Sequence, residues 1–229
     1  MKTLVTILFL PARGTRTLRE RPRWIGAFLL LAMMSVGLII LTERQTAAAV
    51  LARLPSSATP SDNDAAVSML SETLVARSLF EPIRLLAGWS AFAGILFVFV
   101  RTLSPPEPVR YLRLFALEVH AEAALLVGRI AAAVSAMLGH ASAWPEGGAA
   151  PYSAALLVPS THSFTLLSLL SSANIFTLWY VVLLAAGLRV LCGITIRTAA
   201  LVALGAWALS VLFDTGIFTL LIDTLHLRV

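Results

Sequence analysis

Five long runs of apolar residues, separated by polar stretches, dominate the pattern along the chain. They cover residues 24–41, 85–100, 112–138, 178–196 and 199–221. A bilayer core about 30 Å thick requires roughly 20 mostly apolar residues per helix, and each run comes close to or exceeds that length. The pattern therefore predicts an all-α integral membrane protein with five transmembrane helices.

The polar segments between the runs predict loops and short surface helices. Residues 56–66 are rich in Ser, Pro, Asp and Asn, which indicates a loop. The apolar residues that follow, up to Phe80, have helical spacing and predict a short amphipathic helix on the bilayer surface. Residues 3–10 are too short to span and are also expected at the surface. A tight turn at 104–108 and a loop at 139–178 complete the connections.

Composition supports a membrane protein and limits what else the chain can contain. It is 59% hydrophobic and 13% charged, whereas ordinary soluble domains are about 45–50% apolar and about 25% charged. The 229 residues allow a basic cytoplasmic or interfacial segment at 1–23 and one membrane domain at 24–229, without a sizeable soluble domain. The single Cys192 excludes an internal disulfide and is expected to be structural.

Positive charge is distributed unevenly between the two sets of connections. The N-terminal segment and the second and fourth connections hold eleven Lys and Arg, and the opposite side holds five. Because cytoplasmic loops retain positive charge, the N-terminus is expected in the cytoplasm and the C-terminus outside. The net charge of +5 is attributed to this orientation, and no nucleic acid partner is expected. A signal peptide cleaved near residues 46–50 is the alternative for the first run, although its apolar core is longer than usual.

The third run carries ionisable residues that are costly inside a membrane. At about 100° per residue, Glu118, Glu122 and Arg129 form one stripe along the helix. Each such charge costs about 2.5–3.5 kcal/mol at the centre of a span. The small residues on or beside the stripe are Ala121, Gly128, Ala132 and Ala136, and the bulky residues opposite are Val119, Leu126, Val127, Ile130, Val134 and Met137. Since small residues let helices approach, the stripe is expected to face other helices and the bulky face to contact lipid.

Three roles are open for the charged stripe: structural pairing with other helices, a proton or cation site, or a shallow interfacial position. Asp214, in the fifth run, has the same alternatives at a position nearer the outer surface. His120 points away from the stripe and is expected near the cytoplasmic headgroups.

Patterns that carry catalytic chemistry are missing from the chain. There is no phosphate-binding Gly-rich loop with Lys, no G-x-S-x-G and no H-E-x-x-H. Ser160, His162 and Ser163 lie in one connection, but no acid accompanies them to orient the histidine. We therefore predict no catalytic residue, no metal site and no cofactor.

Three stretches resemble the Yip domain family, the Ypt/Rab-interacting membrane proteins and their bacterial relatives. Residues 170–213 are similar to the last two spans of that family, while residues 9–30 and 111–128 resemble its opening segment and its third span. The elements that carry the likeness in the first stretch are Asn174, Phe176, Trp179, Gly187 and Arg197.

The same residues have physical roles of their own. Asn174 or Ser172 can cap the fourth helix, Trp179 and Tyr180 suit a membrane interface, and Gly187 allows close packing.

The resemblance to the eukaryotic branch would imply work in vesicle traffic with prenylated small GTPases. This chain has only about 23 residues before its first span, and its sixteen Arg against one Lys are typical of a GC-rich bacterial gene. We therefore expect a bacterial inner-membrane protein that acts as a non-enzymatic scaffold or accessory subunit. Its partners would be the lipid bilayer and other membrane subunits or a second copy. The alternative is a proton- or cation-coupled transporter that uses the charged stripe, and an intramembrane enzyme is the third possibility.

Overall fold

The structure is a computed structural model that describes residues 2–52, 60–103, 105, 108–138, 152–157 and 164–224. Its elements are α1 (Lys2–Phe9), α2 (Pro11–Glu20), α3 (Ile25–Ala52), α4 (Pro60–Thr102), α5 (Tyr111–Met137), the 3₁₀ helix η2 (Ala154–Leu157), α6 (Phe164–Ser172), α7 (Ile175–Cys192) and α8 (Ile196–Thr224). The predicted all-α membrane class is confirmed. Four stretches of the described residues are long and apolar enough to cross a membrane: Ile25–Thr42, Ser71–Thr102, Ile175–Cys192 and Ile196–Phe213.

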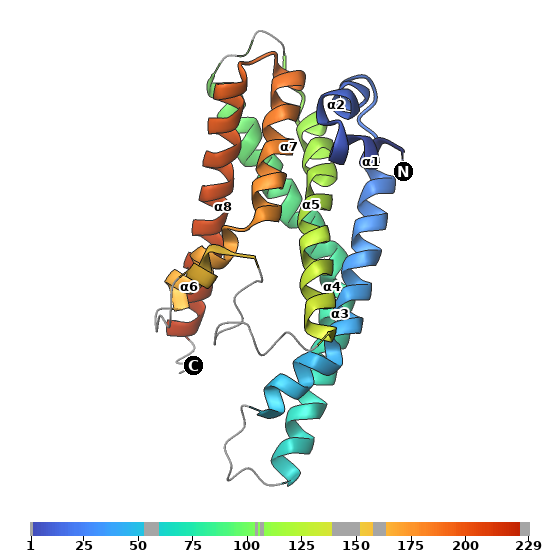
Figure 1. The fold of residues 1–229 in the computed structure, drawn as a ribbon, viewed down its shortest axis with the longest axis vertical. Helices are drawn as coiled ribbons and strands as arrows, with labels where there is room; N and C mark the ends of the chain where they lie inside the picture. The colour runs from blue at the N-terminus through green and yellow to red at the C-terminus, as the bar shows by residue number, and fades with distance from the viewer. Residues whose placement is uncertain are drawn as a thin grey trace.

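Helix α5, which carries Glu118, Glu122 and Arg129, is not among these four stretches. It nevertheless lies in the centre of the bundle, between α3 and α7, and α4 crosses behind it from the side of α3 to α8 (Figure 1). The five long helices run alternately up and down, whereas α1 and α2 lie together at one end (Figure 1). Five spans and the orientation of the termini stay predictions.

Two apolar clusters meet on α5 and hold the bundle together. The first joins Leu117 and Ala124 to Leu184 of α7 and Ala203 of α8. The second joins α5 to Leu31 of α3 and to α4, and it includes residues expected to contact lipid. That expectation is wrong for Val119 and Leu126, which are 0% and 5% exposed because α3 and α4 cover their face.

The rest of the bulky face is more open. Val127, Val134 and Met137 are exposed, while Ile130 is half-buried at the edge of the second cluster. The predicted division of α5 into a buried and a lipid-facing side therefore holds only toward its C-terminal end.

The helices α3 and α4 are longer than their apolar runs. The chain from Pro60 to Thr102 is one helix, so the prediction of a loop through residue 66 followed by a separate surface helix is wrong. Pro60 is the first residue of α4. Its ring fixes the φ angle near the helical value, which explains why a helix begins within the polar stretch. The interior Pro82 lacks an N–H, but the helix continues through it to the end of the apolar run.

The fourth and fifth runs form α7 and α8 with shifted ends. The side chain of Asn174 accepts hydrogen bonds from the backbone N–H of Phe176 at 3.0 Å and of Thr177 at 2.9 Å, so Asn174 caps α7. The helix ends at Gly193, whose φ of 67° lies in the left-handed region that glycine adopts without strain. The short α6 lies in the connection that was expected to be a loop. Its nine residues are too few to give a span signal in the sequence.

The N-terminal helices fold back onto the bundle. Ile7 of α1 and Leu18 of α2 are fully buried and belong to the first apolar cluster. The two helices pack closely at Gly14, where an added Cβ would lie 2.8 Å from the backbone nitrogen of Ile7. Helix α2 therefore has a fixed position beside α7 and α5.

Candidate functional site

Glu118 is the most deeply buried carboxylate in the described part of the chain, with 1% of its surface exposed. The hydroxyl of Tyr180, on α7, lies 2.8 Å from each of its two oxygens and donates to them. At a rise of about 1.5 Å per residue, Glu118 lies about 10 Å from the start of α5 at Tyr111. The bond thus joins α5 to α7 inside the bundle.

Glu122, one turn further along α5, belongs to a network of charges between α4 and α5. Its Oε2 atom lies 3.6 Å from a terminal guanidinium nitrogen of Arg129, and it also interacts with the indole of Trp89 and the charge of Arg84. Arg84 in turn donates to both oxygens of the buried Glu81, at 2.7 and 2.8 Å. The positive charge of Arg129 also acts on Glu81. The charges of two acids and two arginines on α4 and α5 therefore offset each other.

Apart from Glu81, these groups line one cavity of about 760 Å³. Its polar lining comes from α4, α5, α6, α7 and α8 and from the cap residue of α7: Arg84, Glu118, Glu122, Arg129, Ser172, Asn174, Thr177, Tyr180 and Ser210. Apolar side chains from α4, α5, α7 and α8 supply the rest, among them Phe92, Leu125 and Trp207. The cavity has the mixed lining of a small-molecule or ion site.

The structure brings the predicted stripe together and places the small residues around it. Ala121 is fully buried, and Ala132 lines the cavity. Gly128 faces α7, where an added Cβ would lie 2.8 Å from ring atoms of Phe176. The side chain of Ala136 lies outside the described residues.

The family-like residues occupy the same helix interface. Phe176 covers Gly128, and Gly187 of α7 faces Leu117 of α5, whose Cδ2 atom would lie 2.7 Å from an added Cβ. Trp179 is half-buried and its ring packs near Phe9 of α1, with the centroids 6.4 Å apart. Tyr180 was expected at a membrane interface, but that prediction is wrong because it is buried against Glu118.

The other candidates lie apart from this site. His120 is 2% exposed, and its Nδ1 atom lies 2.7 Å from the carbonyl oxygen of Ala116 on the same helix. Ser160, His162 and Ser163 and the side chain of Asp214 lie outside the described residues. Where the chain is described, no three His, Cys, Asp or Glu side chains gather as a metal would require.

Sequence reasoning missed four residues of the site: Glu81, Arg84, Trp89 and Tyr180. Glu81 and Arg84 have the i, i+3 spacing of a helical ion pair, but they were assigned to the polar stretch before the second span. That spacing, followed at once by an apolar run, was the signal that could have placed them on the spanning helix.

The chain matches the family model of the Yip1 domain over residues 5–217. Neither the curated proteins nor the solved structures compared with the chain show a significant match.

Proposed function

Because the chain belongs to the Yip1 domain family, a family of membrane proteins, we propose that it is a non-enzymatic scaffold or accessory subunit. It works in a complex of a bacterial inner membrane. The five long helices, α5 included, are its spans, the N-terminus is cytoplasmic and the C-terminus is outside.

The observation that carries the proposal is the internal pairing of the charged residues. Tyr180 satisfies both oxygens of Glu118, and Glu122 lies within the field of Arg129 and Arg84. Polar groups that find partners within the bundle hold neighbouring helices in one arrangement, because lipid offers no alternative partner. The cluster therefore serves to fix a shape that partners can bind.

The outward faces of the bundle are apolar and available to lipid and to other subunits. Met33 of α3 is 73% exposed and Leu201 of α8 is 71% exposed. The two helices lie at opposite sides of the bundle (Figure 1). Much of this surface contacts lipid, and a partner subunit or a second copy covers the part that lipid does not.

Photo-crosslinking in cells tests the proposal. A crosslinking residue at Leu201 or at Met33 reports on opposite faces, so each serves as the control for the other. We expect one face to give a single protein adduct that also co-purifies at a fixed mass ratio in mild detergent. Lipid adducts alone at both positions, with a monomeric mass, would contradict a scaffold role.

A transporter is the second candidate, and the cavity favours it. About 760 Å³ beside Glu118, Glu122 and Arg129 is room for water or a hydrated cation. Intramembrane carboxylates in such cavities are the groups that carry protons in transporters.

Glu122→Gln separates the two functions. The amide has nearly the same size and still forms hydrogen bonds, so a structural Glu122 tolerates the change while a proton carrier does not. Proton uptake is measured with a pH-sensitive dye in vesicles containing either protein. We expect both to match empty vesicles. Flux by the wild-type protein that disappears in a normally folded Glu122→Gln variant would favour the transporter instead.

A further inference from the structure

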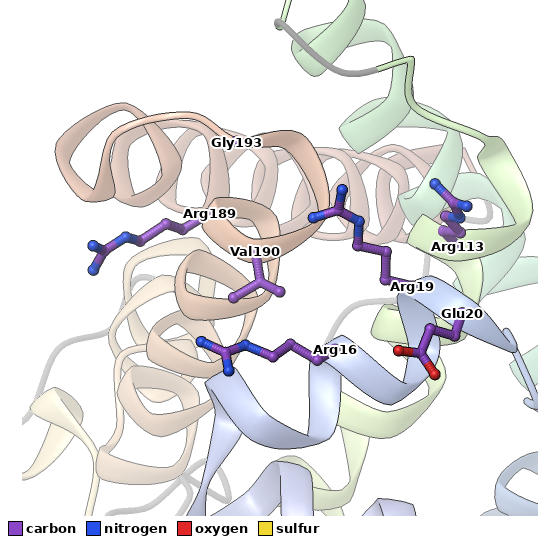
Figure 2. Close-up of a pocket in the computed structure, with 7 residues that line it drawn as sticks. All are labelled: Arg16, Arg19, Glu20, Arg113, Arg189, Val190 and Gly193. Carbon is purple, nitrogen blue, oxygen red and sulfur yellow. The ribbon is translucent and has the colours of Figure 1, made fainter.

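A second pocket, of about 660 Å³, lies at the end of the bundle where α1 and α2 are located. Figure 2 shows that three helices supply its lining: α2, α5 and α7. The charged residues are four arginines, Arg16, Arg19, Arg113 and Arg189, and one acid, Glu20. The pocket is separate from the cavity that contains Glu118 and shares no residue with it.

The packing of α2 determines where its arginines point. Gly14 and Leu18, one turn apart, are buried against the bundle, so Arg16 and Arg19 lie on other sides of this ten-residue helix and are exposed. Both extend from α2 in the direction of α7 in Figure 2. Helix α2 therefore brings two arginines beside the ends of α5 and α7, which form the rest of the pocket.

The other two arginines come from the ends of long helices. Arg113 lies in the first turn of α5, and Arg189 lies in the last turn of α7. The ends of spanning helices lie at the level of the lipid headgroups. The pocket is therefore located where phosphate groups of lipids and soluble phosphates can both reach it.

We propose that this pocket binds the phosphate group of an anionic molecule. A guanidinium group offers a planar pair of N–H donors that matches two phosphate oxygens, and basic pockets between helices at headgroup level bind anionic lipid heads. The lining holds four guanidinium groups against one carboxylate, and a bound phosphate would offset this excess of positive charge. Two sources share this chemistry, an anionic phospholipid headgroup and a soluble phosphate compound.

Binding is measured on the full-length protein with probes for each source. Native mass spectrometry of the protein released from nanodiscs counts retained phosphatidylglycerol against phosphatidylcholine, and calorimetry in neutral detergent measures the affinity for pyrophosphate. We expect a preference for phosphatidylglycerol, binding of pyrophosphate, or both. The two arms identify the source. Equal retention of the two lipids together with no pyrophosphate binding would overturn the proposal.

Variants connect the binding to these residues. Arg16→Gln and Arg113→Gln should each weaken binding about fivefold, since each removes one cation near the phosphate. Arg110→Gln is the matched control, because Arg110 is exposed one turn before Arg113 but does not line the pocket. It should change binding less than twofold. Equal effects at Arg110 and Arg113 would mean that only general surface charge is measured.

The Glu20→Gln variant distinguishes loss of the binding site from misfolding. Removing the one acid of the lining should strengthen binding severalfold, and a damaged fold cannot produce that gain. Unchanged or weaker binding by this variant, at low salt, would contradict a phosphate site that includes Glu20.

Discussion

At the scale of single residues, the bond between Tyr180 and Glu118 joins α5 to α7 through two buried side chains. Tyr180→Phe keeps the ring, which packs near Phe92, and removes only the hydroxyl that both carboxylate oxygens accept from. A buried acceptor without its donor lowers stability by about 1–2 kcal/mol. We therefore expect a lower midpoint of thermal aggregation for Tyr180→Phe, measured by size-exclusion chromatography in one detergent.

The matched control is Tyr111→Phe. The hydroxyl of Tyr111 donates to the carbonyl oxygen of Ser90 at 2.9 Å, but the residue is exposed, so solvent can replace the bond. Its midpoint should stay close to that of the wild-type protein. A loss at Tyr111 as large as at Tyr180 would show that burial of Glu118 is not what makes the hydroxyl important.

Whether the sequence could predict a residue of the site depends on how far that residue lies from its partners along the chain. Glu118, Glu122 and Arg129 share one helix, so helical spacing alone placed them on one stripe. Tyr180 lies 62 positions from Glu118, and no local pattern indicates such a partner. Glu81 and Arg84 were missed for a different reason, because the helix that carries them extends beyond its apolar run.

At the scale of elements, the close contact between α5 and α7 depends on Gly128. An added Cβ already lies 2.8 Å from Phe176, and a leucine side chain would push the helices apart beside Glu122 and Arg129. Overpacking of this kind costs typically 1–3 kcal/mol, whereas an isosteric apolar exchange usually costs less than about 1.5 kcal/mol. Gly128→Leu should therefore lower the aggregation midpoint much more than Ile130→Leu.

The control variant has a small cost of its own. Ile130 is half-buried at the edge of the cluster with α3, so Ile130→Leu is expected to cause a slight loss. A larger loss at Ile130 than at Gly128 would mean that α5 depends more on its contact with α3 than on its contact with α7.

Helix α5 shows which features the hydrophobic pattern predicts and which it does not. The third run was predicted at 112–138 and the helix spans Tyr111–Met137, because a long apolar run without proline has few alternatives. Its faces were assigned incorrectly at Val119 and Leu126, since a helix in the centre of a bundle has neighbours on both sides. Bulky apolar residues suit lipid and protein equally well, so the sequence cannot distinguish the two environments.

At the scale of the whole molecule, the number of membrane spans depends on whether α5 crosses the bilayer. Four described stretches have the apolar character of spans, and α5, which carries Glu118, Glu122 and Arg129, is not among them. Its position among α3, α4 and α7 favours a fifth span in which Glu118 and Glu122 are covered by protein, while the side chain of Arg129 is 44% exposed. The basic residues at the start of α5 and at the end of α7 lie at the same end of the bundle as α2, as expected if this end faces the cytoplasm.

Reporter fusions at residues on either side of α5 test this arrangement. If α5 crosses the membrane, reporters after Pro105 and after Leu156 lie on opposite sides, because α5 separates the two positions. The excess of Lys and Arg places Pro105 in the cytoplasm, together with Ile194 between α7 and α8, and places Pro60 and Leu156 outside. A phosphatase active only outside and a fluorescent protein active only inside report each position independently. Finding Pro105 and Leu156 on the same side would rule out α5 as a span and leave its charges at the membrane surface.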